Sequence, residues 1–372
     1  MNERPVLALN DPALARGFSS LGPRLVPEGI IPRGAAGAVI AGGEAVALAG
    51  GPLAFDRVRL VWRQDEAAKE CVASLVSVRD WAERTGDAAA FEVALGAIAR
   101  ERAAFAGFDP GRPAIVGVLN VTPDSFSDGG RFDTAQKAID HGRAMIDAGA
   151  QMIDIGGEST RPGADPVPIA EQCRRVLPVI DALAPHTVIS VDTRSAEVLR
   201  AALAAGAKVM NDVSALTADP VALETVAEAG CPVILMHSRG TPQTMQRNPR
   251  YSDVRLDIFD FLEARVAACI EAGIAPNKIA VDPGIGFGQN DTHIGLLLRD
   301  IAILHGLGCP VMLGASRKSF IGRIDQGTPA KGRLPGSLAA ALHGVDRGIQ
   351  LLRVHDVAET CQALAVWSHL GR

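Results

Sequence analysis

The chain has 372 residues, enough for one large domain or two of ordinary size. Its 42 acidic and 37 basic side chains leave a net charge of -5, which argues against a general nucleic-acid-binding protein. Hydrophobic residues make up 48% of the chain but aromatic residues only 4%, so we expect an aliphatic core of the kind found in α/β proteins.

Residues 1–110 have little regular pattern. We expect a small N-terminal α/β extension of unknown role, which ends at the turn Asp109-Pro110-Gly111. If the extension is accessory, its deletion should leave a folded main domain; the alternative is that it covers apolar surface of that domain. Its predicted elements are short strands at 45–49, 58–62 and near 71–78, and a helix around 88–106.

From residue 111 to residue 372, short aliphatic runs alternate eight times with Ala-rich helical stretches. Continuous apolar runs are typical of parallel strands covered by helices, and eight such units in about 250 residues predict a (β/α)8 TIM barrel. A doubly wound open sheet is the alternative. The predicted strands are Ile115–Val121, Met152–Gly156, Val188–Asp192, Lys208–Val213, Val233–His237, Ile279–Asp282, Val311–Gly314 and Gln350–His355. The predicted helices lie near 134–148, 168–183, 195–205, 219–229, 254–272, 292–306, 334–347 and 356–370.

Polar residues gather where these predicted strands end, which is where barrel enzymes place their active sites. Carboxylates and amides beside clustered cations suit a small polar ligand that carries an anionic group. A ring of ion pairs that only stabilises the barrel is the alternative. The residues concerned are Asn120, Asp154, Ser159, Thr160, Arg161, Asp192, Asn211, Asp212, Asp282, Arg317, Lys318, Arg353 and His355.

Two weaker patterns point to cofactors that we do not expect. Gly284, Gly286 and Gly288 follow a strand as in a dinucleotide-binding loop, but no acidic residue closes the next strand. His237 ends the fifth predicted strand, but no second His or Cys lies at metal-ligand spacing, so a hydrogen-bonded residue at the barrel mouth is the better interpretation.

The cysteines and the apolar stretches indicate a cytoplasmic protein. The six cysteines are scattered with no CxxC pair, so we expect reduced, mostly buried thiols. Charged residues interrupt the N-terminal apolar run, and Glu44 and several glycines interrupt the stretch 38–55. We therefore expect neither a secretory signal nor a membrane span.

Eight segments within residues 113–372 resemble the dihydropteroate synthase family. They are GVLNVTPDSFSDGGRF (117–132), IDIGGESTRPGA (153–164), VDT (191–193), NDV (211–213), LMHSRGTPQTMQRNP (235–249), DPGIGFGQ (282–289), GASRKSFIG (314–322) and RVHDV (353–357). The resemblance implies a TIM-barrel transferase of folate biosynthesis. This enzyme condenses 6-hydroxymethyl-7,8-dihydropterin diphosphate with 4-aminobenzoate to 7,8-dihydropteroate and pyrophosphate. The resemblance also implies Mg²⁺ as cofactor, small-molecule substrates, a homodimer, and no nucleic-acid or membrane partner.

The resemblance assigns roles to individual residues of this sequence. The catalytic residues would be Asn120, Arg161, Lys318, Arg353 and His355. The pterin would be bound by Asp192, Asn211, Met236, Asp282, Phe287, Lys318 and Arg353. The diphosphate would be bound by Asn120, Thr160, Arg161, Arg353 and His355, with Asn120 as a ligand of Mg²⁺. The 4-aminobenzoate pocket would be formed by Phe126, Asp128, Arg161, Pro162, Phe287 and Ser316.

Two departures from the family pattern are visible: Gln289 stands where Lys is common, and Ser238-Arg239 replaces a Met-Gln pair. The alternatives to a synthase are a pterin-binding methyltransferase that acts on methyltetrahydrofolate and a corrinoid, and a non-catalytic pterin-binding paralogue. The segments 159–163 and 353–355 argue against the methyltransferase, because it needs no diphosphate site. The intact set of polar site residues argues against the paralogue.

Overall fold

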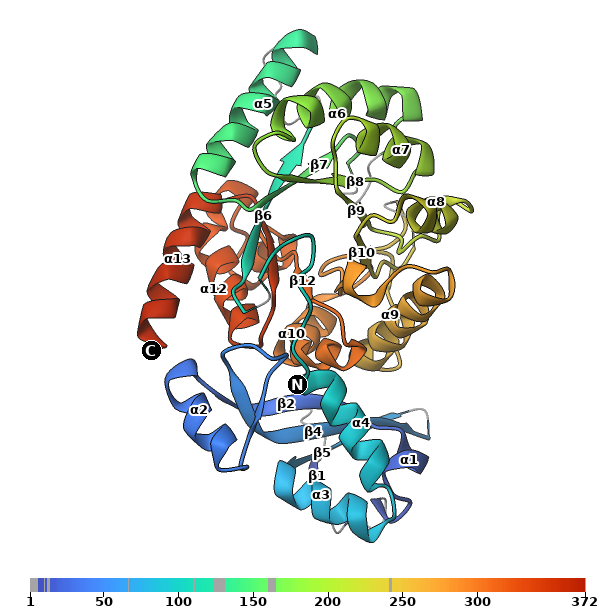
Figure 1. Cartoon of the computed structure of the whole chain (residues 1–372), viewed down its shortest axis with the longest axis vertical. Helices are drawn as coiled ribbons and strands as arrows, with labels where there is room; N and C mark the ends of the chain where they lie inside the picture. The colour runs from blue at the N-terminus through green and yellow to red at the C-terminus, as the bar shows by residue number, and fades with distance from the viewer. Residues whose placement is uncertain are drawn as a thin grey trace.

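The computed structural model describes residues 6–9, 11, 14–65, 67–109, 111–122, 131–159, 165–240 and 243–371. The chain forms an eight-stranded parallel barrel surrounded by helices, and a smaller sheet built from the first 74 residues lies against one side of it (Figure 1). This architecture confirms the predicted α/β class, a (β/α)8 barrel with a small N-terminal α/β extension.

The barrel strands follow one another around the sheet in the order β11-β10-β9-β8-β7-β6-β13-β12. A bridge between Val281 and Val311 joins the two outermost strands and brings the barrel close to closure. The strands are β6 (Ala114–Asn120), β7 (Met152–Gly156), β8 (Val188–Asp192), β9 (Val209–Asp212), β10 (Val233–Met236), β11 (Ile279–Asp282), β12 (Met312–Leu313) and β13 (Leu351–Val354).

Helices connect successive strands, as a parallel sheet requires. They are α5 (Arg131–Asp147), α6 (Ile169–Leu183), α7 (Ala196–Ala204), α8 (Ala222–Ala229), α9 (Val254–Glu271), α10 (Asp291–Arg299), α11 (Ser319–Ile324), α12 (Leu334–Val345) and α13 (Val357–Leu370). The predicted helix 292–306 is in fact α10 followed by the 3₁₀ helix η4 (Ile301–Leu307), and the short α11 was not predicted.

The barrel strands are apolar on both faces because both faces are buried. Every second residue points to the barrel axis, where Val116, Met152, Val209, Ile234 and Ala280 pack with Phe105 in one cluster. Their neighbours in sequence point outward and join the larger core beneath the helices. This double burial explains why the strands could be predicted from continuous aliphatic runs.

The extension is a mixed sheet in the order β1-β5-β4-β2, with β3 paired to β4. The predicted strand near 71–78 is wrong in its second half, because Ser74 accepts a hydrogen bond from the backbone N–H of Ser77 and starts a helix there. The extension's elements are β1 (Val6–Leu7), α1 (Phe18–Leu21), β2 (Arg24–Ile31), α2 (Arg33–Ala41), β3 (Val46–Ala47), β4 (Ala54–Gln64), β5 (Ala67–Ser74), α3 (Leu75–Arg84) and α4 (Ala88–Ala99).

The extension covers part of the barrel's side. Val26, Val61 and Ala68 of its sheet belong to the same buried hydrophobic cluster as the barrel's outer core. At this contact Arg255, at the start of α9, is fully buried and forms ion pairs with three carboxylates.

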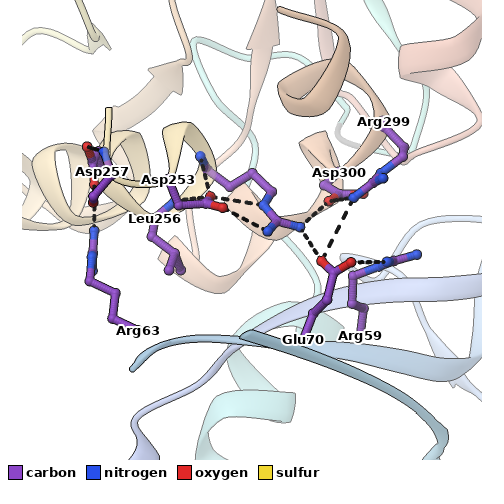
Figure 2. Close-up of polar contacts among 10 residues, drawn as sticks. Arg59, Arg63, Glu70, Asp253, Leu256, Asp257, Arg299 and Asp300 are labelled. Atoms are coloured by element: carbon purple, nitrogen blue, oxygen red, sulfur yellow. Dashed lines mark hydrogen bonds and ion pairs between the residues drawn. The ribbon is translucent and has the colours of Figure 1, made fainter. Parts of the chain in front are cut away.

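One of these three carboxylates comes from the extension (Figure 2). The Arg255 guanidinium lies 2.8 Å from Glu70 of β5, 2.9 Å from Asp253 and 2.7 Å from Asp300. Closer to solvent, Arg63 of β4 pairs with Asp257 of α9 at 2.8 Å. These contacts favour the alternative in which the extension covers apolar barrel surface.

All six cysteines are free thiols, as expected, and four of them are buried. Within the described residues, no helix is both long enough and apolar enough to cross a lipid bilayer.

Candidate active site

A pocket opens at the carboxyl ends of the barrel strands, and all seven residues assigned to pterin binding line it. They are Asp192, Asn211, Met236, Asp282, Phe287, Lys318 and Arg353. The free volume is about 20 Å³, which is too small for a bicyclic ring, so a ligand has to move some of these side chains apart.

The guanidinium of Arg353, at the end of β13, joins the two sides of the pocket. Its Nε donates to Asp154 Oδ2 at 2.6 Å, and its Nη2 donates to Asp192 Oδ2 at 2.8 Å. Burial raises the pKa of Asp192 to about 7; the Arg353 charge opposes this shift, and the nearby Asp154 carboxylate adds to it. Arg353 therefore neutralises part of the negative charge at the pocket and leaves the acceptor oxygens in place.

Two buried acceptor atoms beside Arg353 have no hydrogen-bond partner among the described residues. Asn211 donates from Nδ2 to Asp154 Oδ2 at 3.0 Å, but Asn211 Oδ1 and Asp154 Oδ1 are left unpaired. Buried polar atoms are almost always hydrogen-bonded, and leaving one unpaired costs about 1–3 kcal/mol. A ligand rich in N–H donors that enters beside Arg353 could satisfy these unpaired acceptors.

Asp282 is held at the end of β11 by the turn that follows it. Its Oδ1 accepts the backbone N–H of Gly284 at 2.6 Å, which fixes the carboxylate orientation. Gly284 has a φ of 66°, and a Cβ there would lie 1.9 Å from the carbonyl oxygen of His237, so only glycine fits. Burial raises the pKa of Asp282 to about 6, while the Gly284 N–H and the Lys318 charge lower it.

Lys318 and Phe287 close the pocket from the other side. The Lys318 Nζ lies 4.1 Å from the centre of the Phe287 ring, a cation–π contact. The loop that carries Phe287 is braced by Gln289, whose Oε1 accepts the backbone N–H of Gly286 at 3.0 Å. Gln289 Nε2 donates to the carbonyl of Pro283 at 3.3 Å. Gln289, which departs from the family pattern, thus stabilises the loop that carries the pocket residue Phe287.

Asn120 and His355 lie at the ends of neighbouring strands β6 and β13. A Cβ at Gly156 would lie 3.3 Å from Asn120 Oδ1 and 3.8 Å from Asp192 Oδ2, so the glycine allows these two side chains to approach each other. The His355 ring Nδ1 lies 3.1 Å from Ser316 Oγ. The backbone N–H of His355 donates to the same oxygen at 3.2 Å, so the buried Ser316 orients this imidazole.

Glu158 holds the base of the second loop, residues 158–166, which follows β7. Its Oε1 accepts the backbone N–H of Val167 at 3.0 Å, and its Oε2 accepts from Arg194 at 2.7 Å. Thr160, Arg161 and Pro162 of this loop lie outside the described residues, and so do Phe126 and Asp128 of the first loop, residues 122–130, which follows β6. Their assigned roles stay predictions from the sequence.

Three residues singled out in the sequence have specific surroundings at this site. Arg317, grouped above with the cations of the ligand site, forms an ion pair with Asp356. His237 donates its backbone N–H to the carbonyl of Asp282 at 3.0 Å and packs edge-on against Phe261, with ring centres 5.0 Å apart, while its buried Nδ1 has no partner among the described residues. Asp154 received no individual role from the family resemblance, although an ionisable residue inside a buried strand is a signal of function.

The residues of this site suit a metal ion that is held mainly by substrate phosphates. Within the described part of the chain, no group of three or more His, Cys, Asp or Glu side chains could hold a metal ion. Mg²⁺ bound through substrate phosphates needs only one or two protein oxygens, and the amide oxygen of Asn120 at the pocket edge fits that requirement.

Comparisons with known proteins agree with this geometry. Residues 116–355 match the family model "Pterin binding enzyme". Dihydropteroate synthase of Escherichia coli K12 is 46% identical over 260 residues, which are 69% of this chain and 92% of that protein.

Two solved structures show the same barrel. Xanthomonas albilineans dihydropteroate synthase with 4-aminobenzoic acid has a TM-score of 0.67 and 46% identity, and the match covers 71% of this chain and 96% of that one. The Xanthomonas albilineans enzyme in complex with 7,8-dihydropteroate has a TM-score of 0.65 and 43% identity, over 71% of this chain and 95% of that one.

The fold and the pocket define a pterin-binding barrel enzyme. The chain belongs to the dihydropteroate synthase family, and the family activity is that of a transferase.

Proposed function

We propose that the pocket at the carboxyl ends of the strands joins 6-hydroxymethyl-7,8-dihydropterin diphosphate to 4-aminobenzoate. The products are 7,8-dihydropteroate and pyrophosphate. The observation that carries this assignment is the set of acceptors around Arg353, in which Asn211 Oδ1 and Asp154 Oδ1 are buried and unpaired. A pterin presents adjacent N–H donors along a flat edge, so it can satisfy such a set.

Pterin recognition would rest on Asp282, Asp192 and Asn211. The Asp282 carboxylate accepts two N–H groups from the amino-pyrimidinone edge, because each carboxylate oxygen has more than one acceptor site. Lys318 donates to the ring's carbonyl and nitrogen acceptors, and it leaves the Phe287 ring to do so. Met236 and Phe287 provide the apolar walls of the pocket.

The diphosphate would lie over the ends of β6 and β13. Arg353, braced by Asp154 and Asp192, presents the rest of its guanidinium to the leaving group, and His355, oriented by Ser316, adds a second donor. The sequence assigns Thr160 and Arg161 of the second loop to the same anion. Charge-assisted hydrogen bonds from several directions are the usual way to bind a diphosphate.

Mg²⁺ is the cofactor that we propose, with Asn120 as its protein ligand. Held there, Mg²⁺ would supply positive charge to the diphosphate leaving group. The protein's own residues hold the diphosphate in one orientation and keep the pterin methylene facing the second substrate.

The reaction needs no protein nucleophile. The bond between the pterin methylene carbon and the diphosphate oxygen breaks, and the oxygen leaves with the electron pair. The amine of 4-aminobenzoate forms the new C–N bond and releases a proton. Arg353, His355 and Lys318 lower the barrier by stabilising the leaving charge and by positioning the pterin.

The 4-aminobenzoate would lie against Phe287. The other pocket residues that the sequence assigns are Phe126, Asp128, Arg161, Pro162 and Ser316.

A substitution pair tests this arrangement. Arg353→Met should lower turnover by at least 10²-fold, because it removes a donor to the leaving group and leaves Asp154 and Asp192 unneutralised. Arg79→Met breaks an ion pair with Glu92 in the extension and is the matched control, for which turnover should be unchanged. Turnover of folded Arg353→Met close to wild type would refute the assigned site.

We further propose that residues 111–372 form the catalytic unit, that residues 1–110 form a distinct extension, and that the enzyme is a homodimer in the cytoplasm. Six free thiols suit a reducing compartment. The exposed Val366 of α13 offers apolar surface to a second copy. Light scattering at twice the chain mass supports the dimer; a single-chain mass at micromolar concentration would refute it.

A further inference from the structure

A second, larger cavity lies at the opposite end of the barrel from the active site. Its volume is about 910 Å³, and its walls come from the extension, from the amino ends of β6 and β13, and from α13. In Figure 1 this is the region where α2 approaches the C-terminal end of α13. The backbone N–H of Gly34 in α2 donates to the carbonyl of Gly371 at 3.2 Å, which joins the two walls.

Three arginines line this cavity, and none of them is ion-paired in the part of the chain that the structure describes. Arg33 comes from the extension, Arg112 from the segment that connects it to the barrel, and Arg347 from the turn before β13. By contrast, most arginines at the contact between extension and barrel form ion pairs. The acidic lining residue Asp346 already accepts from the indole Nε1 of Trp367 at 2.6 Å.

Apolar side chains form much of the remaining wall, which also contains Gln151, Gln350 and Ser368. Leu48 and Leu53 face it from the extension, and Ile349, Leu364 and Trp367 face it from the barrel. A volume of 300–1,000 Å³, apolar walls and a few convergent charges are typical of small-molecule sites, which occur often at domain contacts.

We propose that this cavity is a second ligand site, for an organic anion with a carboxylate or phosphate group on a flat or aliphatic body. The guanidinium fork of arginine matches both kinds of anion. Three positive side chains against one engaged carboxylate give the cavity a net positive charge, while the leucines and Trp367 take the apolar body. The site is separate from the proposed reaction, because the active-site residues lie at the other ends of the same strands.

The family comparison also sets this cavity apart. The family match begins at residue 116, so Arg33, Leu48, Leu53 and Arg112 lie outside it. About half of the cavity wall is thus built by the part of the chain that precedes the family match.

Tryptophan fluorescence provides a local readout. The chain has three tryptophans. Trp62 and Trp81 are buried in the core of the extension, and Trp367 is the one that lines the cavity. The full-length protein would be titrated with 1-naphthyl phosphate and with 2-naphthoate, each with saturating Mg²⁺ and pyrophosphate to occupy the diphosphate site. Neutral 1-naphthol serves as the uncharged comparison.

At least one of the two anions should quench tryptophan fluorescence in a saturable way, and the naphthol should not. The quenching should be lost in Trp367→Phe. The double variant Arg112→Ala/Arg347→Ala should bind the anion at least tenfold more weakly. Arg143→Ala, which removes an exposed arginine on α5, should bind like wild type. Arg33→Ala, tested by itself, probes the opposite wall should the double variant fail to fold.

Three outcomes would overturn the proposal: no saturable quenching by either anion, equal affinity for the naphthol, or unchanged affinity in the folded arginine variants. The relative affinities of the phosphate and the carboxylate distinguish the two anion classes.

Discussion

Replacing Asp282 with Asn tests pterin recognition with almost no change of shape. Asp282 is 3% exposed, and its Oδ1 accepts the backbone N–H of Gly284 at 2.6 Å. In the variant, the amide oxygen has to keep that position, because the amide nitrogen cannot accept from Gly284. The Asn NH₂ therefore takes the place of Oδ2 and faces the pocket.

The pterin would then meet a donor where wild type offers an acceptor. An unmade buried hydrogen bond costs about 1–3 kcal/mol, and more when a charged partner is lost. Since about 1.4 kcal/mol corresponds to tenfold in affinity, pterin affinity should fall at least tenfold. Calorimetric titration with 6-hydroxymethylpterin measures this, with Asp181→Asn, an exposed residue of α6, as the matched control.

The same carboxylate predicts a pH dependence. Burial raises the pKa of Asp282 from 3.8 to about 6, so pterin affinity of the wild type should fall as the pH drops through 6. Between pH 4 and 6 the folded state binds more protons at Asp282 than the unfolded state does, so this group's contribution to stability declines as pH rises through that window. Asp282→Asn lacks this titration and should melt no lower than wild type at pH 8.

The opposite pattern would refute the reasoning. If Asp282 served only to pair with a neighbouring cation, the Asn variant would melt lower at pH 8 and bind pterin unchanged. Unchanged pterin affinity in a folded Asp282→Asn protein would mean that the pocket described above is not the pterin site.

Further predictions concern the extension, a pocket wall and the second loop. Glu70→Ala should lower the free energy of unfolding by about 1–3 kcal/mol, because Arg255 loses one of its three buried carboxylate partners, whereas the exposed Arg63→Ala should cost about 0–1 kcal/mol. Deletion of residues 1–110 should abolish the cooperative thermal transition, because it uncovers buried barrel surface. Gln289→Ala should raise KM for the pterin substrate several-fold, because the buried N–H of Gly286 loses its acceptor. Arg161→Ala should lower kcat by about 10²–10³ while pterin affinity changes little.

Each of these has a contradicting outcome. Equal melting temperatures for Glu70→Ala and Arg63→Ala would show that the buried network is unimportant. A soluble, cooperatively melting barrel after deletion would show that the extension is accessory. An unchanged KM in Gln289→Ala would show that the loop carrying Phe287 does not affect pterin binding. More than half of wild-type turnover in Arg161→Ala would show that Arg161 does not bind the diphosphate.

The barrel could be predicted from the sequence because a short apolar run marks each of its strands. The runs Met152–Gly156, Val188–Asp192 and Ile279–Asp282 have the same bounds in the structure, since each is a short, mostly apolar run that ends in a polar or glycine residue. The strand-end rule then predicted polar residues at the barrel mouth. The family resemblance assigned some of them to pterin binding and added Met236 and Phe287, and all seven assigned residues line one pocket.

The extension was less predictable because long-range pairing determines it. β2 contains Pro27, Glu28 and Gly29, which disfavour a strand, yet it pairs with β4 as an edge strand, where proline is tolerated. The burial of Arg255 depends on Glu70, 185 residues away, so the local sequence of α9 carries no sign of it. Asp154 could have been assigned, because it is a charge within a fully buried strand.

The most direct measurement is the reaction itself. Purified full-length protein, Mg²⁺, 6-hydroxymethyl-7,8-dihydropterin diphosphate and 4-aminobenzoate would be incubated, and both products quantified by chromatography. The expected result is 7,8-dihydropteroate and pyrophosphate in equal amounts, with formation that depends on 4-aminobenzoate. Folded protein that binds the pterin substrate but forms no dihydropteroate would contradict the proposed function.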